Sequence, residues 1–253
     1  MKADNHTGLL TKNKIEKVSY EDKLQLENYL EAISAFEKLT YQSVYVIDYA
    51  EMKFEYVSGN PLFLCGHTVA EVMEMGYGFY FNNVPEKDLQ LLDLINETGF
   101  DFFEKLPIGE KKQYSITYDF HLQNKNGKST LINHKLTPLF LNAEGKMWKA
   151  FCVVSISANK TAGNAAIHKQ GSDQIWHLDL NSQLWKKQVK PQLTERELEV
   201  LRLYAQGLTI NQIADKIFVS PDTVKYYRRR IFENFGVSNI VEALSYAVNN
   251  KVI

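Results

Sequence analysis

Hydrophobic and polar positions alternate strictly along residues 114–123, where Tyr, Ile, Tyr, Phe and Leu are separated by Ser, Thr, Asp and His. This period of two is typical of a β-strand with one buried face and one solvated face. Turn residues follow, and further apolar segments lie on either side of them. The pattern predicts an antiparallel sheet of five strands interrupted by helices, with the strands at 44–48, 54–58, 114–123, 129–141 and 146–157.

A different period marks residues 19–38, where apolar residues recur every three or four positions. This spacing predicts an amphipathic helix, which needs a surface to cover its apolar stripe. Two surfaces are candidates, namely the domain that follows and a second subunit. The preceding residues, 1–18, are predominantly polar and are predicted to form a disordered N-terminus.

The end of the chain, residues 191–253, carries the start and stop signals of four short helices. Capping boxes predict where the first two begin, and a Ser-Pro pair predicts the start of the third. Only residues 218–220 separate the second helix from the third, which predicts a helix-turn-helix. The signals are Thr194 with Glu197, Thr209 with Gln212, Ser220 with Pro221, Gly236 as a stop, and Asn239 with Glu242.

The third of these helices, projected at about 100° per residue, has two distinct faces. Its apolar stripe is predicted to be buried and consists of Val224, Tyr227, Ile231 and Phe235. The opposite face carries Asp222, Lys225, Tyr226, Arg229 and Glu233. Lys225 and Arg229 are suited to donate to purine edges of neighbouring base pairs, and Tyr226 adds an apolar contact. Arg228 and Arg230 flank the two faces, so they are predicted to contact phosphates.

Residues 193–244 resemble the LuxR-type helix-turn-helix domain of bacterial transcription regulators. LTERE, the Ile-Ala pair, SPDTVK and the closing Gly-Val-x-Asn-x-x-Glu-Ala stand in the order found in that family. The resemblance implies that Lys225, Tyr226 and Arg229 read bases. It also implies phosphate contacts at the starts of the second and third helices, by Thr209, Asn211, Ser220 and Thr223. Two positions depart from the common pattern, because Tyr227 replaces a frequent histidine and Asn234-Phe235 replaces a frequent Lys-Leu.

Charge is divided unequally along the chain, although the net charge is only -1. Residues 1–158 hold 16 lysines and 21 acidic residues, whereas residues 159–253 hold 13 basic and 9 acidic residues. Every arginine lies in residues 191–253. This division favours an acidic front half that avoids phosphate and a basic end that attracts it.

The apolar segments and the cysteines indicate the cellular location that we expect for the protein. No apolar run approaches the roughly 18 residues that a membrane helix requires, and the start of the chain lacks the apolar core of a secretion signal. Cys65 and Cys152 have no metal-binding spacing and are predicted to be reduced, buried thiols. We therefore expect a soluble, cytoplasmic protein with no membrane contact.

Residues 39–158 resemble a PAS domain in the order of two strands, a helical middle and a three-stranded meander. The likeness is carried by GHTVAEV at 66–72, VPEKDL at 84–89, Asn126-Gly127 and the closing segment 151–156. PAS domains sense small molecules, light or redox state, or pair subunits. The many aromatic residues of this segment form either an apolar pocket for an unidentified small ligand or simply a core.

Particular cofactors are disfavoured by the residues themselves. GYGFYFNNV at 76–84 lacks the cysteine that flavin photoreceptors of this kind use, and residues 87–105 lack a histidine for haem. His67, His121 and His134 are scattered, so each is expected at the surface or in a hydrogen bond rather than on a metal. We predict no metal site, and no cofactor is assigned.

Between the two halves, residues 159–190 are predicted to be a linker that contains a hairpin. Its strands are expected at 175–180 and 183–187, with Trp176 and Trp185 as cross-strand neighbours. The hairpin either shields a sheet edge or transmits a change in the first domain to the second.

The sequence thus predicts a two-domain α+β protein, a PAS-like sensor followed by an all-α LuxR-type domain at 191–253. We expect a one-component transcription regulator that binds double-stranded DNA through the major groove as a homodimer. By the resemblance, the fourth helix, 240–249, supplies part of the pairing surface; a small ligand and RNA polymerase are further candidate partners. Enzymatic activity is not expected, because no phosphate loop or nucleophile elbow is present. The alternatives are an interaction scaffold without DNA binding and a sigma-factor fragment, which the SPDTVK motif disfavours.

Overall fold

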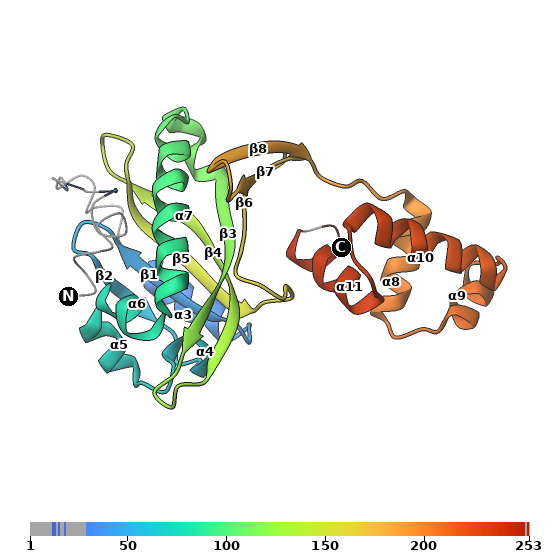
Figure 1. The fold of residues 1–253 in the computed structure, drawn as a ribbon, viewed down its shortest axis with the longest axis horizontal. Helices are drawn as coiled ribbons and strands as arrows, with labels where there is room; N and C mark the ends of the chain where they lie inside the picture. The colour runs from blue at the N-terminus through green and yellow to red at the C-terminus, as the bar shows by residue number, and fades with distance from the viewer. Residues whose placement is uncertain (1–11, 14, 16–17, 19–28, 251, 253) are drawn as a thin grey trace. The chain divides into compact units, whose positions relative to one another are not determined.

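The computed structural model describes residues 12, 13, 15, 18, 29–250 and 252 (Figure 1). The chain divides into two compact units, residues 1–188 and 189–253. The first contains an antiparallel sheet with helices, and the described part of the second is helical apart from Val189, the last residue of the final strand. The predicted α+β architecture with a helical C-terminal domain is therefore confirmed.

The predicted number of five strands is wrong, because the sheet has eight strands in the order β2-β1-β5-β4-β3-β6-β7-β8. The five expected strands correspond to β1 to β5, so the order of two strands, a helical middle and a meander is confirmed. The strands are β1 Ser43–Asp48, β2 Lys53–Val57, β3 Tyr114–Gln123, β4 Ser129–Leu141, β5 Met147–Ile156, β6 Gly163–Lys169, β7 Gln174–Asp179 and β8 Leu184–Val189.

The three additional strands come from the segment that was expected to be a linker. β6 pairs with β3, and Ile167 stands opposite Ile116. This pairing joins residues about fifty positions apart, so it cannot be predicted from a local period in the sequence. The predicted hairpin is present as β7 and β8, but it continues the sheet rather than standing outside it.

Alternation along β1 divides the packing between two faces of the sheet. Tyr45 and Ile47 belong to the inner core, whereas Val44 and Val46 belong to a smaller cluster on the opposite face. Helices from the middle of the chain cover the inner face, and the long α7 lies across the strands (Figure 1). These helices are α4 Pro61–Leu64, α5 Val69–Met75, α6 Gly78–Asn83 and α7 Glu86–Glu104, followed by a 3₁₀ helix at Ile108–Gln113.

Helix α3, Tyr29–Glu37, packs on the other face of the sheet. Ile33 is buried there against Val44 and Val46, so the described part of the predicted amphipathic helix uses its own domain as partner. Reciprocal hydrogen bonds hold both ends of α3: Tyr29 donates to Glu55 of β2, and Tyr56 of β2 donates to Glu37 of α3. Residues 19–28 of the predicted helix lie outside the described residues.

Part of the predicted disordered N-terminus packs on the sheet. Asn13 and Ile15 are buried, and Nδ2 of Asn13 donates to the carbonyl oxygen of Met147 at 2.6 Å. The prediction of disorder is wrong for these two residues, because they cover apolar surface of the first unit; residues 1–11, 14, 16 and 17 lie outside the described residues. None of the described helices combines the length and the apolarity that crossing a bilayer requires.

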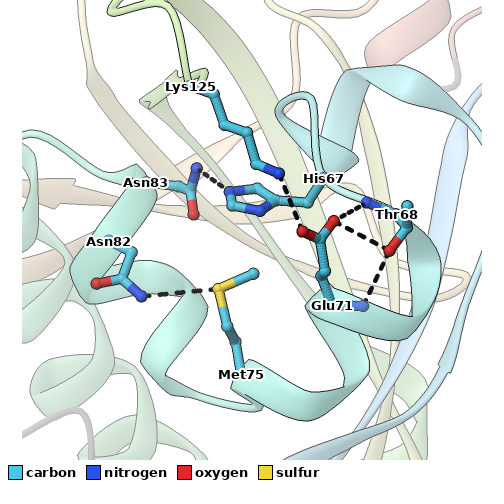
Figure 2. A network of polar contacts seen from close by, with 7 residues as sticks. All are labelled: His67, Thr68, Glu71, Met75, Asn82, Asn83 and Lys125. Carbon is cyan, nitrogen blue, oxygen red and sulfur yellow. Dashed lines mark hydrogen bonds and ion pairs between the residues drawn. The ribbon is translucent and has the colours of Figure 1, made fainter.

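A polar network fixes α5 and α6 against the turn between β3 and β4 (Figure 2). Glu71 closes the capping box of α5 with Thr68 and pairs with Lys125 at 3.1 Å. Asn83 donates to the carbonyl oxygen of Gln123 at 3.0 Å and lies 3.3 Å from Nε2 of His67. These contacts orient α6, whose aromatic residues enter the inner core.

The second unit is built around one hydrophobic cluster. Its centre contains Val200, Leu201, Ile213, Val224 and Ile231, each fully or almost fully buried. The four helices described in this unit are α8 Glu195–Ala205, α9 Ile210–Lys216, α10 Pro221–Phe235 and α11 Ile240–Asn249.

Candidate nucleic-acid interface and ligand cavity

The predicted helix starts in the second unit are confirmed in their hydrogen bonds. Glu197 accepts from the backbone N-H of Thr194 at 2.8 Å, and Gln212 accepts from that of Thr209 at 2.9 Å. In each case the threonine hydroxyl accepts from the amide three residues on, which completes a capping box. Ser220 caps α10 by accepting from the N-H of Thr223 at 3.1 Å. Local capping chemistry therefore sets where α8, α9 and α10 begin.

The turn between α9 and α10 contains an unusual residue. Phe218 has a φ of 56°, in the left-handed region, and its side chain is 93% exposed. The next residue, Val219, returns its N-H to the carbonyl oxygen of Ala214 at 3.0 Å and closes the turn. The short connection holds α9 and α10 as a compact pair, which is the helix-turn-helix arrangement.

Helix α10 has the two faces that its sequence predicts. Val224 and Ile231 are fully buried and Phe235 is nearly so, whereas Tyr227 is only partly buried. Lys225, Tyr226 and Arg229 are exposed together on the other side. The guanidinium of Arg229 lies 5.9 Å from the centroid of the Tyr226 ring. This face thus presents two cations and an aromatic side chain to solvent.

The two flanking arginines have different surroundings. Arg228 is partly buried, and its guanidinium carbon lies 5.9 Å from the ring centroid of Phe232. It also approaches Tyr204 of α8: burial raises the pKa of that hydroxyl, and the charge of Arg228 opposes the shift. Arg230 reaches back toward α8, with Nε 3.8 Å from Oε1 of Glu197. Both arginines therefore contact the body of the unit as well as its surface.

The residues implied in phosphate binding lie at the two helix starts. Thr209 and Asn211 are exposed at the beginning of α9, and Ser220 is exposed at the cap of α10. Thr223 is partly buried, with its hydroxyl 2.9 Å from that of Ser220. Backbone N-H groups and the helix dipole favour anions at such positions.

Two acidic residues on the exposed face of α10 have no predicted role in DNA binding. Asp222 Oδ1 lies 2.9 Å from Nζ of Lys225, and Glu233 Oε1 lies 3.9 Å from Nε of Arg229. The sequence spacing could have predicted both ion pairs, because the partners stand three and four residues apart on one helix. Each cation expected to read bases therefore has an acidic neighbour.

A second candidate site is a cavity of about 80 Å³ inside the first unit. Its lining is mainly apolar and comes from α7, β3 and their neighbours, with Asn96 and Ser115 among the polar residues. Five tyrosines line it. Burial raises the pKa of Tyr49, Tyr77, Tyr80 and Tyr118, so the hydroxyls of these four stay neutral at physiological pH. No Asp, Glu, Lys or Arg is among the lining residues that the structure describes.

One of these tyrosines begins a buried chain of hydrogen bonds. Tyr80 and Tyr45 share a bond of 2.7 Å between their hydroxyls, and the Tyr45 hydroxyl lies 2.6 Å from Nε2 of His134. Burial lowers the pKa of His134 to about 3. The imidazole is therefore neutral, and its Nε2 shares a hydrogen bond with the Tyr45 hydroxyl. The burial of His134 could have been predicted from the alternation along β4, because this histidine stands between Ile132 and Leu136, which both face the inner core.

The other two histidines singled out in the sequence also make hydrogen bonds. Nδ1 of His121 lies 2.8 Å from Oδ2 of Asp88, at the start of α7. His67 bonds to Asn83 in the network described above. Among the described residues, no group of three or more His, Cys, Asp or Glu side chains is placed to hold a metal ion. Cys65 and Cys152 are free and buried, and burial raises the pKa of the Cys65 thiol to about 12.

Comparison with known proteins concerns mainly the helical unit. Residues 191–247 match the family of bacterial regulatory proteins called the luxR family. BvgA of Bordetella pertussis, a positive transcription regulator of virulence factors, is 38% identical over 60 residues, which are 24% of this chain and 29% of BvgA. YxjL of Bacillus subtilis, a transcriptional regulatory protein, is 40% identical over 60 residues, which are 24% of this chain and 28% of YxjL. The chain thus spans less than a third of either relative.

Among solved structures, a VqmA dimer of Vibrio cholerae is 19% identical, with 87% of each chain covered and a TM-score of 0.35. The PAS domain of the fruit-fly ELK potassium channel is 15% identical, covering 51% of this chain and 98% of that one, with a TM-score of 0.37. The PAS-like character of the first unit rests on its own strand order.

Proposed function

From the premise that residues 191–247 form a DNA-binding domain of the luxR family, we propose that this chain regulates transcription by binding promoter DNA through α10. One observation carries the proposal: Lys225, Tyr226 and Arg229 are exposed together on a helix whose opposite face is buried. A helix presented in this way by a compact helix-turn-helix enters the major groove. We assign base reading to these three residues.

Phosphate contacts are assigned to the surrounding residues. The starts of α9 and α10 offer backbone N-H groups and hydroxyls, and the flanking arginines add charge. Arg228 and Arg230 also hold intramolecular partners, so binding phosphate requires them to rearrange or to share those contacts. The assigned residues are Thr209, Asn211, Ser220, Thr223, Arg228 and Arg230.

Gel retardation of genomic DNA fragments at two salt concentrations tests this proposal. A DNA-binding regulator retards a subset of fragments, and raising the salt weakens the complexes because counterions are no longer released as favourably. A chain that retards no fragment at either concentration is instead an interaction scaffold. Arg229→Ala tests the assignment to α10, because it removes one charge from the exposed face of that helix without removing a buried group, and its complexes should be weaker.

We further propose that the first unit senses a small, uncharged molecule in the cavity beside α7. An apolar lining with a few neutral hydroxyls suits a compact aromatic or heterocyclic ligand, because an ion would lose its hydration without gaining a counter-charge. The four tyrosines would fix its orientation by hydrogen bonds. Native mass spectrometry of the purified chain checks for a retained molecule.

A substitution that fills the cavity sharpens this test. Gly99 lines the cavity from α7, whereas Glu97 is exposed on the same helix. We expect phenol or indole to raise the melting temperature of the unmodified chain and of Glu97→Leu, but not that of Gly99→Leu. Absence of both a retained molecule and any thermal shift would rule out the sensor assignment.

Pairing of two chains is proposed through α11. Val241 and Val248 are exposed on this helix, seven residues apart and therefore on one side of it. A shared apolar contact there would let two reading helices bind a two-fold DNA site. Analytical ultracentrifugation of the Val241→Lys variant, with and without DNA, measures the contribution of α11 to pairing.

A further inference from the structure

The exposed face of α10 carries an acid where DNA would be closest. Asp222 lies in the first turn of the helix, its side chain is 86% exposed, and its carboxylate pairs with Lys225 at 2.9 Å. Residues near the start of a recognition helix are those that contact base edges. Asp222 therefore belongs to the region of α10 that enters the groove first.

A carboxylate in the major groove discriminates strongly between bases. Guanine and the methyl-bearing thymine present carbonyl oxygens there, and a carboxylate facing them is repelled and left without a donor. Cytosine presents an N4 amino group, which can donate to the carboxylate. Adenine also presents an amino group, N6, but it stands beside the acceptor N7, which repels a carboxylate. An aspartate on the exposed face of α10 therefore favours cytosine.

Asp222 differs in this respect from the other acid on the same face. Glu233 lies in the last turn of α10, 3.9 Å from both Arg229 and Arg230, so its charge is shared between two cations. Asp222 stands one turn before Lys225 and two turns before Arg229. A base that it contacts would neighbour the base read by Lys225.

We propose that Asp222 is a specificity-determining residue that accepts a hydrogen bond from the amino group of a cytosine in the binding site. The inference rests on the proposed function, since it requires α10 to enter the major groove. The same carboxylate orients Lys225 toward the adjoining base pair and lowers affinity for DNA that lacks the cytosine. A simpler role is stabilisation of the helix start by a negative charge, and this role predicts no base preference.

Selection of duplexes from a random-sequence library by the full chain tests the proposal. Unmodified protein is expected to enrich cytosine at one position beside the base read by Lys225. Asp222→Ala should lose that enrichment and reduce discrimination at the position by roughly 5- to 150-fold. Asp222→Asn should shift the preference toward adenine, because an amide pairs with the N6 and N7 atoms of that base.

A matched control removes an acid elsewhere in the same unit. Glu199 of α8 is half-buried and pairs with Arg196 at 2.7 Å, so Glu199→Ala changes the net charge equally. This variant should keep the cytosine preference. If Asp222→Ala and Asp222→Asn also keep it while their overall affinity or melting temperature changes, the proposal is overturned and DNA binding stands. If the unmodified chain enriches no sequence at all, the proposed function fails together with it.

Discussion

Trp185 of β8 donates its indole N-H to the backbone carbonyl oxygen of Thr98 in α7, at 3.0 Å. The same indole meets the ring of Phe102, with 6.1 Å between centroids, and Phe102 also contacts Trp176 of β7 at 5.3 Å. Phe102 lines the cavity beside α7. The wall of the cavity and the last two strands before the helical unit therefore share one aromatic cluster.

Removing the Trp185 contact should loosen the hairpin from α7. Trp185→Phe loses the hydrogen bond to Thr98 and is expected to reduce the free energy of unfolding by about 1 kcal/mol. Trp185→Ala also loses aromatic packing and should cost about 2 kcal/mol. Urea unfolding followed by near-ultraviolet circular dichroism measures both changes. Leu184→Ala is the control, because that side chain is largely exposed, and an equal loss there would refute the role of the cluster.

Arg229 and Arg228 should differ in their effect on DNA binding. Arg229→Ala removes a proposed base contact and is expected to cost about 1–3 kcal/mol on the preferred site but less on random DNA. Arg228→Ala removes a proposed phosphate contact, so affinity should fall alike on all sequences and the salt dependence should weaken. Fluorescence anisotropy with specific and random duplexes separates the two. Equal losses on both DNAs for both variants would contradict the assignment.

Backbone strain at the helix-turn-helix turn should respond to a single substitution. Phe218 has a positive φ and an exposed ring, so Phe218→Gly relieves the left-handed conformation and removes little buried surface. We expect stabilisation by roughly 1 kcal/mol in thermal unfolding. Gly207, with a φ of 83°, is the opposite case. A Cβ at position 207 meets no other atom, so the strain of Gly207→Ala comes from the backbone conformation alone. We expect this variant to lose about 1 kcal/mol of the free energy of unfolding.

Acid should destabilise the first unit through His134. Burial lowers the pKa of this imidazole to about 3 in the folded protein, whereas an unfolded chain has the usual value of about 6.5. Between these values the unfolded state binds a proton that the folded state does not. Stability is therefore fully present above pH of about 6.5 and falls as the pH is lowered, until the loss levels off near pH 3.

The His134→Phe variant isolates this contribution. It removes the titrating group, so its free energy of unfolding should vary less with pH between about 6.5 and 3 than that of the unmodified chain. The difference is on the order of a few kcal/mol at the acid end. Urea unfolding at a series of pH values provides the comparison. Parallel pH profiles for the two proteins would exclude His134 as the source.

Local signals predicted the helical unit better than the sheet. Thr194, Thr209 and Ser220 satisfy amides within three residues of themselves, so their capping chemistry is readable from neighbouring letters. β6 pairs with β3 across about fifty residues, and its short apolar segment has no period that specifies a partner. The expectation of a linker failed there because strand pairing is a non-local contact.

The sequence by itself determined the two-unit organisation, the helix starts, and the exposed group of Lys225, Tyr226 and Arg229, because each follows from periodicity and spacing along one element. Only the tertiary structure decided which charges meet and which polar groups are buried. In the folded chain Arg230 lies beside Glu197 of another helix, and the buried His134 is hydrogen-bonded to Tyr45, which is bonded in turn to Tyr80. The tertiary structure also joined the hairpin to the wall of the cavity through Phe102. These relationships depend on packing between distant segments, which no local pattern encodes.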